Sequence, residues 1–221
     1  MTKAAELIDA VLERVRDPGG AAHPRALVRS LLDRCQQAIQ AAAPGWVMQV
    51  KLPTQKRQSI YPVSTFADLS DTDHPACLRV VRVTEGFPPR DLTEVPWRSL
   101  ALVDRRWLRR TAGEFISFAR LGVDLLVLFP GKAQISEVLV LYAGVPTPLT
   151  GEDTQFELRD DRLQAVAALT EILLLLRQRT LAPLTEAAAR LQKDVARLEP
   201  VRGTGVSGFG QGGFGFPVGV E

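Results

Sequence analysis

The feature that most constrains the fold is a β-like segment that runs through two prolines into a strongly apolar helix. Ile135–Tyr142 is rich in isoleucine, valine and leucine and ends in tyrosine, a composition that suits a β-strand. Pro146 and Pro148 then remove backbone donors, so strand pairing must end there and a helix cannot begin. Leu163–Leu176 follows as an apolar helix. This order predicts a β-region placed between helical parts of the chain.

The first 45 residues predict a pair of helices. Apolar residues recur at helical spacing from Leu7 to Val15, and the turn sequence DPGG at 17–20 ends this first helix. Pro24 suits the first position of a second helix, whose single apolar stripe stops at Pro44. Two short consecutive helices of this kind are expected to form a hairpin.

From Trp46 onward the apolar residues alternate with a period of two, which indicates strands. Further strands are expected at 57–63, 77–84, 115–120 and 123–129. Gly122 and the pair Pro130–Gly131 are expected to join the last three β-segments as two hairpins. A short helix is expected at Asp104–Arg110. Together these segments predict an antiparallel β-domain.

The helix at 163–176 has apolar residues on almost every side, so it is expected to be buried all round. Asp160 and Asp161 offer an N-cap and a favourable negative charge at its start. A last helix follows Pro183 with a narrower apolar stripe, formed by Leu184, Ala188, Leu191, Val195 and Leu198. The predicted fold class is α+β, with a helical bundle built from the N-terminal hairpin and two C-terminal helices, an inserted antiparallel β-domain and an extended C-terminal tail.

The chain divides into three predicted parts. Residues 1–45 and 159–199 form the helical bundle, and residues 46–158 form the β-rich inserted domain. After Pro200 the composition changes to a Gly- and Phe-rich sequence that cannot build a packed core alone. Residues 200–221 are therefore predicted to form a C-terminal arm.

Composition excludes several classes of protein. A net charge of +2 over 221 residues argues neither for a nucleic-acid-binding protein nor for a disordered one. The longest apolar run is far shorter than the ~20 residues that span a bilayer. The N-terminal segment is polar and charged, unlike a secretory signal. A protein made in the cytoplasm, without a membrane span, is therefore expected.

Chemistry-bearing residues form no recognisable catalytic, cofactor or metal site. Cys35 and Cys77 are interpreted as small buried hydrophobic residues rather than as a disulfide or metal pair. His23 and His74 each precede a proline and have no ligand or nucleophile spacing, so both are interpreted as loop residues. The cluster Asp68, Asp71 and Asp73 lacks the glycine and distal glutamate of a calcium loop and is interpreted as solvated.

One cluster of positive charge in the sequence could bind an anionic group. It consists of four arginines around Trp107, namely Arg105, Arg106, Arg109 and Arg110. Three interpretations stay open for it: contact with acidic groups of a neighbouring subunit, a solvated face, and pairing with a DNA backbone.

In the order of its parts the chain resembles the head-to-tail adaptor (connector) proteins of tailed bacteriophages. Three segments carry the resemblance, AELIDAVLERVRDP, ALVRSLLDRCQQAIQAAAPGW and VLVLYAGVPTPLTGEDTQFELRDDRLQAVAALTEILLL, followed by a final helix with a C-terminal extension. The resemblance covers residues 4–199 and rests on the order and spacing of the elements.

This resemblance implies a structural virion protein and not an enzyme. It implies a ring of twelve copies at the virion neck, bound to the portal on one side and to tail or nozzle proteins on the other. DNA would pass through the channel without specific binding, and neither a cofactor nor a membrane is involved. The C-terminal extension of such proteins inserts into or wraps the portal, which makes Phe209, Phe214 and Phe216 candidate contact residues beside the four arginines.

Two alternatives come from other functional classes. An adaptor that also degrades the cell wall would need two carboxylates about 5 to 10 Å apart. A nucleic-acid-binding protein is the other alternative, and the near-neutral charge disfavours it.

Overall fold

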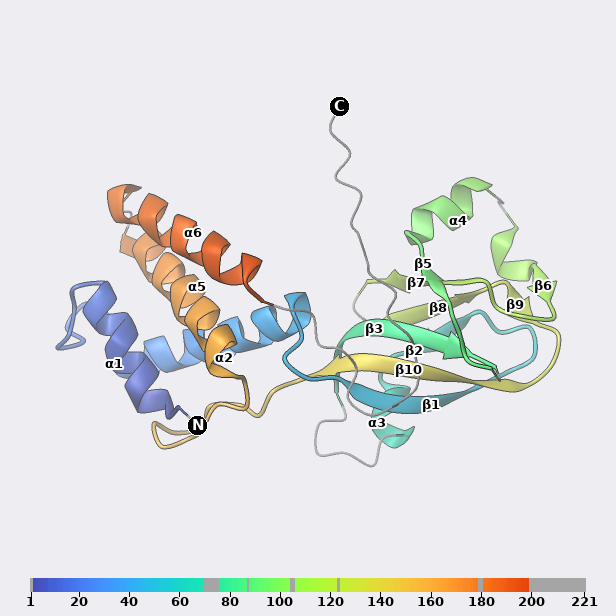
Figure 1. The fold of residues 1–221 in the computed structure, drawn as a ribbon, viewed down its shortest axis with the longest axis horizontal. Helices are drawn as coiled ribbons and strands as arrows, with labels where there is room; N and C mark the ends of the chain where they lie inside the picture. The colour runs from blue at the N-terminus through green and yellow to red at the C-terminus, as the bar shows by residue number, and fades with distance from the viewer. Residues whose placement is uncertain are drawn as a thin grey trace.

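The computed structural model describes residues 2–69, 76–86, 88–103, 106–122, 124–178 and 181–198. Four long helices form one body, and two packed β-sheets form a second body beside it (Figure 1). The helices come from both ends of the described chain, whereas the sheets come from its middle. The predicted α+β class, with a helical bundle and an inserted antiparallel β-domain, is confirmed.

The N-terminal hairpin consists of α1 (Ala4–Arg14) and α2 (Arg25–Ala42). Asp17 organises the turn between them, because its carboxylate accepts the backbone N–H groups of Ala21, Ala22 and His23 at 2.8 to 3.0 Å. This local capture of backbone donors is what short polar side chains do in turns. The predicted hairpin is therefore confirmed.

Helix α5 (Asp160–Gln178) is the centre of the bundle and packs against α1, α2 and α6 (Leu181–Ala196). Its N-terminal half is buried on several sides. Burial on all sides was the expectation. It holds for Leu174 and Leu175 in the C-terminal half and is wrong for one face of that half, where Leu173 is 37% and Leu176 is 52% exposed. Asp160 and Asp161 both lie in the first turn of the helix.

Helix α6 packs on α5 with a slightly different face from the predicted one. Leu184 and Leu191 pack against the core cluster as expected. Ala187 is fully buried in place of Ala188, and Val195 is 41% exposed. The buried face shares Leu184, Leu191 and Leu198 with the predicted stripe and differs from it at Ala187 and Val195.

The β-domain is a sandwich of two four-stranded sheets. The first sheet has the order β1 (Met48–Thr54), β10 (Ser136–Gly144), β3 (Cys77–Glu85) and β4 (Arg90–Asp91). The second has the order β2 (Ile60–Pro62), β8 (Leu125–Phe129), β7 (Ser117–Leu121) and β5 (Thr93–Glu94). A further pair, β6 (Thr111–Ala112) and β9 (Gly131–Lys132), runs parallel. The two large sheets share one buried cluster that includes Val83, Phe118, Leu126 and Tyr142.

Only one of the two predicted hairpins forms. β7 and β8 pair across Gly122, which has a φ of 69° and so uses the left-handed freedom of glycine. The hairpin expected at Pro130–Gly131 is wrong, because β8 pairs with β2 and β7 and has no free edge for β10. The chain instead crosses to the other sheet, where β10 lies between β1 and β3.

Short helices cover the sandwich. Phe66 of α3 (Thr65–Leu69) is fully buried and lies 5.6 Å from Tyr142 between ring centroids. On the second sheet, α4 (Trp97–Val103) and the 3-10 turn η1 (Trp107–Arg109) supply Leu100 and Trp107 to a third cluster with Ala119. The helix expected at 104–110 is thus reduced to η1, and residues 104 and 105 lie outside the described residues.

The segment after β10 returns to the bundle. Leu149, Phe156 and Leu158 belong to the helical core, and Lys3 forms a β-bridge with Gln155. The segment directly follows the last strand, yet its buried side chains belong to the core of the helices. The domain boundaries themselves stay a prediction.

Candidate interaction surfaces

The described residues offer little for catalysis or metal binding. No group of three or more His, Cys, Asp or Glu side chains among them is arranged to hold a metal ion. His23 is buried beside Gln178, with 2.6 Å between their nitrogen atoms, whereas His74, Asp71 and Asp73 lie outside the described residues. None of the helices in the described part of the chain is both long and apolar enough to cross a bilayer.

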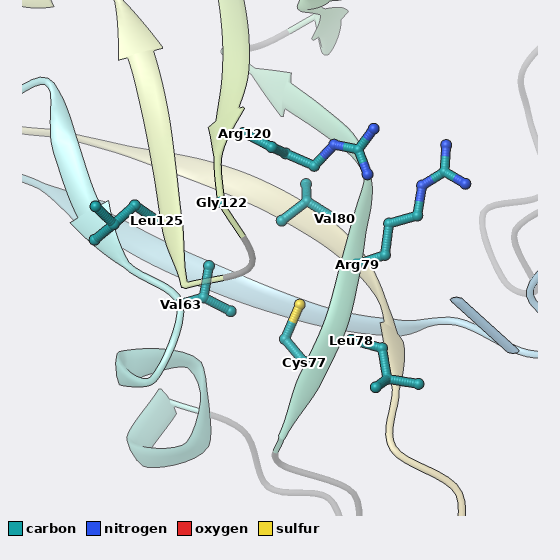
Figure 2. Close-up of a pocket in the computed structure, with 8 residues that line it drawn as sticks. All are labelled: Val63, Cys77, Leu78, Arg79, Val80, Arg120, Gly122 and Leu125. Carbon is teal, nitrogen blue, oxygen red and sulfur yellow. The ribbon is translucent and has the colours of Figure 1, made fainter. Parts of the chain in front are cut away.

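A small cavity of about 60 Å³ lies between β3 and the β7–β8 hairpin (Figure 2). Cys77 lines it, and burial raises the pKa of this thiol to about 12, so the sulfur stays protonated at neutral pH. Arg120 at its rim is held by Glu94 at 2.7 Å. The cavity is too small for a substrate of ordinary size, since ligand pockets measure roughly 300 to 1,000 Å³.

The predicted arginine cluster lies at the end of the β-domain away from the helical bundle, next to β6 (Figure 1). Arg106, Arg109 and Arg110 are exposed, and Arg105 lies outside the described residues. Trp107 fixes the segment, because it is buried against Phe129 with 6.5 Å between ring centroids. The structure thus brings three of the four predicted arginines together on one turn.

Lys56 and Arg57, two cations that were not predicted to lie here, are close to this cluster. Arg57 donates its backbone N–H to the Lys132 carbonyl oxygen at 2.7 Å, and Gly131 donates to the Arg110 carbonyl oxygen at 3.0 Å. A Cβ at Gly131 would stand 3.4 Å from the Arg110 oxygen and 3.6 Å from the Arg57 carbonyl carbon. The turn that carries Lys56 and Arg57 therefore lies directly beside the η1 segment.

We call this group the basic corner. It comprises Lys56, Arg57, Arg106, Arg109 and Arg110, all of which are exposed. Within the described residues no ion pair engages Lys56, Arg57 or Arg109. Arg106 and Arg110 already interact within the described residues, so the charges open to an anionic partner are those of Lys56, Arg57 and Arg109.

Exposed apolar side chains occur on both bodies. On the β-domain, Leu102 is 86% and Leu108 is 48% exposed, on α4 and η1 respectively. On the bundle, Leu173 and Leu176 stand on one face of the C-terminal half of α5, which we call the α5 ridge. Leu173 and Leu176 are neighbours on this face, so a partner protein that covered it would bury both side chains.

Helix α1 presents an acidic face opposite its buried side. Glu6, Asp9 and Glu13 are exposed at a spacing of three and four residues. Arg25 pairs with Asp9 and donates to Glu152 at 2.9 Å, and this hydrogen bond lowers the pKa of Glu152 below its ordinary value. Glu6 and Glu13 have no partner among the residues that the structure describes.

A polar joint connects the two bodies. The α2 helix ends there, and its last carbonyl groups need donors. Arg79 of β3 donates to the carbonyls of Ala41 and Ala42 at 3.3 Å. Arg162 of α5, whose side chain is 2% exposed, donates to Ala43 at 3.2 Å and to Pro44 at 3.0 Å.

The joint is also tightly packed. A Cβ at Gly45 would lie 3.0 Å from Arg162 Cδ and 3.3 Å from Leu158 Cδ2. Gln40, which is fully buried, accepts the Gly45 N–H at 2.7 Å and donates to the Trp46 carbonyl oxygen at 2.9 Å. The first chain crossing between bundle and β-domain is therefore held by side chains from both bodies.

Two carboxylates, those of Glu85 and Glu171, are buried. Glu85 in the β-domain accepts the Phe115 N–H at 2.9 Å and pairs with Lys132 and Arg90. Glu171 in the bundle pairs with Arg190 alone, and its second oxygen has no hydrogen-bond partner among the described residues. Both serve to hold neighbouring elements together.

The predicted contact residues of the C-terminal arm, Phe209, Phe214 and Phe216, lie outside the described residues. Their role therefore stays a prediction.

Both bodies carry exposed charged or apolar side chains, and one packed joint holds the bodies together. The SU10 adaptor protein family model matches residues 2–206, which is nearly the whole chain. The chain therefore belongs to the SU10 adaptor protein family and is a phage adaptor protein. No curated protein is detectably similar to it.

Proposed function

We propose that this adaptor joins the portal of a phage head to the tail as a ring of twelve copies at the virion neck. The α5 ridge carries the proposal. A helix at the centre of the bundle exposes Leu173 and Leu176, which a monomer would gain stability by burying. In a symmetric ring, the same surface of each neighbouring copy would cover this face.

The two bodies suit contacts on two sides. The bundle carries the α5 ridge, and the β-domain carries Leu102, Leu108 and the basic corner at its far end (Figure 1). Each copy in a ring has a neighbour on both sides, so the α5 ridge and the basic corner are proposed to contact neighbouring copies.

The C-terminal arm is proposed to reach the portal. Phe209, Phe214 and Phe216 are separated by glycines in a sequence without a core-forming pattern. Aromatic side chains on such a segment gain binding energy by filling pockets of a partner.

The arginines at 105, 106, 109 and 110 are proposed to face protein carboxylates and not DNA. Each phosphate that a protein neutralises adds salt-dependent affinity for DNA, which would slow a duplex passing through the ring. Arginine forms two parallel hydrogen bonds with a carboxylate and so fixes geometry between subunits. The role is structural and non-enzymatic.

Co-sedimentation with isolated portal particles tests the proposal. The full chain is expected to bind and form a ring, a chain lacking residues 201–221 is expected to stay folded and lose binding, and a Phe209→Ala, Phe214→Ala, Phe216→Ala variant is expected to match the deletion. Mutation of Val218→Ala and Val220→Ala controls for changes in the same segment. Wild-type occupancy by the deleted chain would contradict the role of the arm, and absence of binding by the full chain would contradict the adaptor ring.

A further inference from the structure

We propose that the basic corner of one copy binds the acidic face of α1 on the next copy. The inference rests on the proposed ring and adds which surfaces join its subunits. The proposed partner of the basic corner is a second copy of this chain, because the chain carries both a basic and an acidic exposed face.

The corner presents positive charge from two segments far apart in sequence. Arg57 and Arg109 are exposed and have no ion-pair partner within the described ranges. Their backbones are fixed, since the Arg57 N–H donates a hydrogen bond to the Lys132 carbonyl oxygen and buried Trp107 holds the η1 turn. A fixed backbone reduces the entropy lost when a partner binds.

The acidic face matches this display. Glu6 and Glu13 lie two helical turns apart, which is about 10.5 Å along an α-helix axis. Asp9 between them is already engaged by Arg25, so the two glutamates are the carboxylates of this face left for a partner. Helix α1 is itself rigidly placed, because Ile8, Val11 and Leu12 on its other side are fully buried.

The two faces lie at opposite ends of the molecule, with α1 at the left and β6 and β9 at the right of Figure 1. A two-fold pair could join the two faces only with the copies side by side in antiparallel orientation. In the proposed ring the copies join head to tail, and such contacts close when the rotation between copies permits. The position of the charges therefore agrees with a cyclic assembly.

The surroundings of the corner favour a protein over nucleic acid. Leu108 stands between the arginines of η1 and is 48% exposed. An aliphatic side chain gains free energy when it is buried against another protein, and a phosphate backbone gives it no such gain. Charged groups at the edge of such a contact act mainly on orientation and association rate.

Charge reversal on portal particles tests the contact, with the mass of the assembled ring as readout. Arg57→Glu with Arg109→Glu makes the corner acidic, and Glu6→Lys with Glu13→Lys makes the α1 face basic. Each double variant is expected to weaken ring formation by about tenfold or more, since every contact in the ring then joins like charges. Lys51→Glu with Arg197→Glu makes the same change in net charge as the corner variant at exposed sites elsewhere and is expected to leave the ring intact.

Restoration of charge complementarity separates this contact from a general loss of folding. The chain with all four reversals, and an equal mixture of the two double variants, are both expected to recover the ring. An unchanged ring in either double variant, or no recovery in the mixture, overturns the inference while the proposed function stands. Loss of duplex DNA binding by the corner variant with an intact ring would assign the corner to nucleic acid instead. A wild-type chain that forms no ring contradicts the proposed function and this contact together.

Discussion

The helical bundle and the β-domain differ in where they place the residues that stabilise the fold and the residues that are proposed to contact partners. In the bundle both tasks fall on α5, where fully buried Leu174 stands next to Leu173, which is part of the exposed α5 ridge. In the β-domain the strands form the core, and the charged contact residues lie on turns, at Lys56 and Arg57 and around η1. The β-domain surface can therefore change without loss of the fold, whereas neighbouring positions on α5 have opposite roles.

The buried carboxylate of Glu85 in the β-domain gives the largest expected effect. Glu85→Ala removes a carboxylate that pairs with Lys132 and Arg90 and accepts the Phe115 N–H. Removing one member of a buried ionic group costs about 3 to 5 kcal/mol of unfolding free energy. Chemical denaturation measures the change, and Glu114→Ala is the control, because this exposed partner of Arg90 is expected to contribute less than about 1 kcal/mol. Equal costs at the two positions would contradict the role of the buried network.

Two adjacent leucines on α5 sharpen the comparison within the bundle. Leu174→Ala is expected to cost about 2 to 5 kcal/mol, because the side chain is fully buried. Leu173→Ala is expected to cost less than about 1 kcal/mol in the monomer, because this side chain is partly exposed. Thermal or chemical unfolding of the isolated chain distinguishes them, and Leu173→Ala is expected to weaken ring formation despite its small effect on stability. Similar losses for both changes would mean that α5 has no free ridge.

The sequence predicted the class of each body and the order of the elements, because helical periodicity at 7–15 and alternation from Trp46 onward are local signals. It did not predict that β10 crosses to the other sheet, since the pairing of strands depends on edges occupied by residues far away. The basic corner shows the same limit: Arg106, Arg109 and Arg110 form a visible cluster, whereas Arg57 joins them only through Gly131 and Lys132. The exposed face formed by Leu173 and Leu176 was missed, because periodicity does not tell how many partners surround a helix.

The joint between the two bodies is expected to show an intermediate effect. Gly45→Ala places a methyl group about 3.0 Å from Arg162 Cδ, where the chain crosses from bundle to β-domain. Overpacking of this kind costs about 1 to 3 kcal/mol. Gly113→Ala is the matched control, because a Cβ there meets no atom within 4 Å. Small-angle scattering is expected to show a broader range of angles between the two bodies for Gly45→Ala and not for Gly113→Ala. Identical melting curves for the two variants would contradict tight packing at the joint.

The smallest expected effect concerns the ionic contact of Glu152 with Arg25. The hydrogen bond from Arg25 lowers the pKa of Glu152 below its ordinary value of 4.5 in the folded chain. A carboxyl with a lowered folded-state pKa adds stability above its unfolded pKa and loses it as the pH falls through the folded value. Glu152→Gln is therefore expected to lower the melting temperature slightly at pH 7, and this difference is expected to shrink as the pH falls below 4.5. A difference that grows on acidification would contradict this sign.

The most direct test of the central claim is the mass of the wild-type protein on isolated portal particles, measured by native mass spectrometry. The account predicts that the particle gains a closed set of twelve chains of 24.2 kDa each and that this gain falls when Leu173 and Leu176 are both replaced by glutamate. Binding of single chains without a closed set, or a full ring that tolerates both glutamates, would contradict the claim that the exposed face of α5 joins this adaptor into a ring.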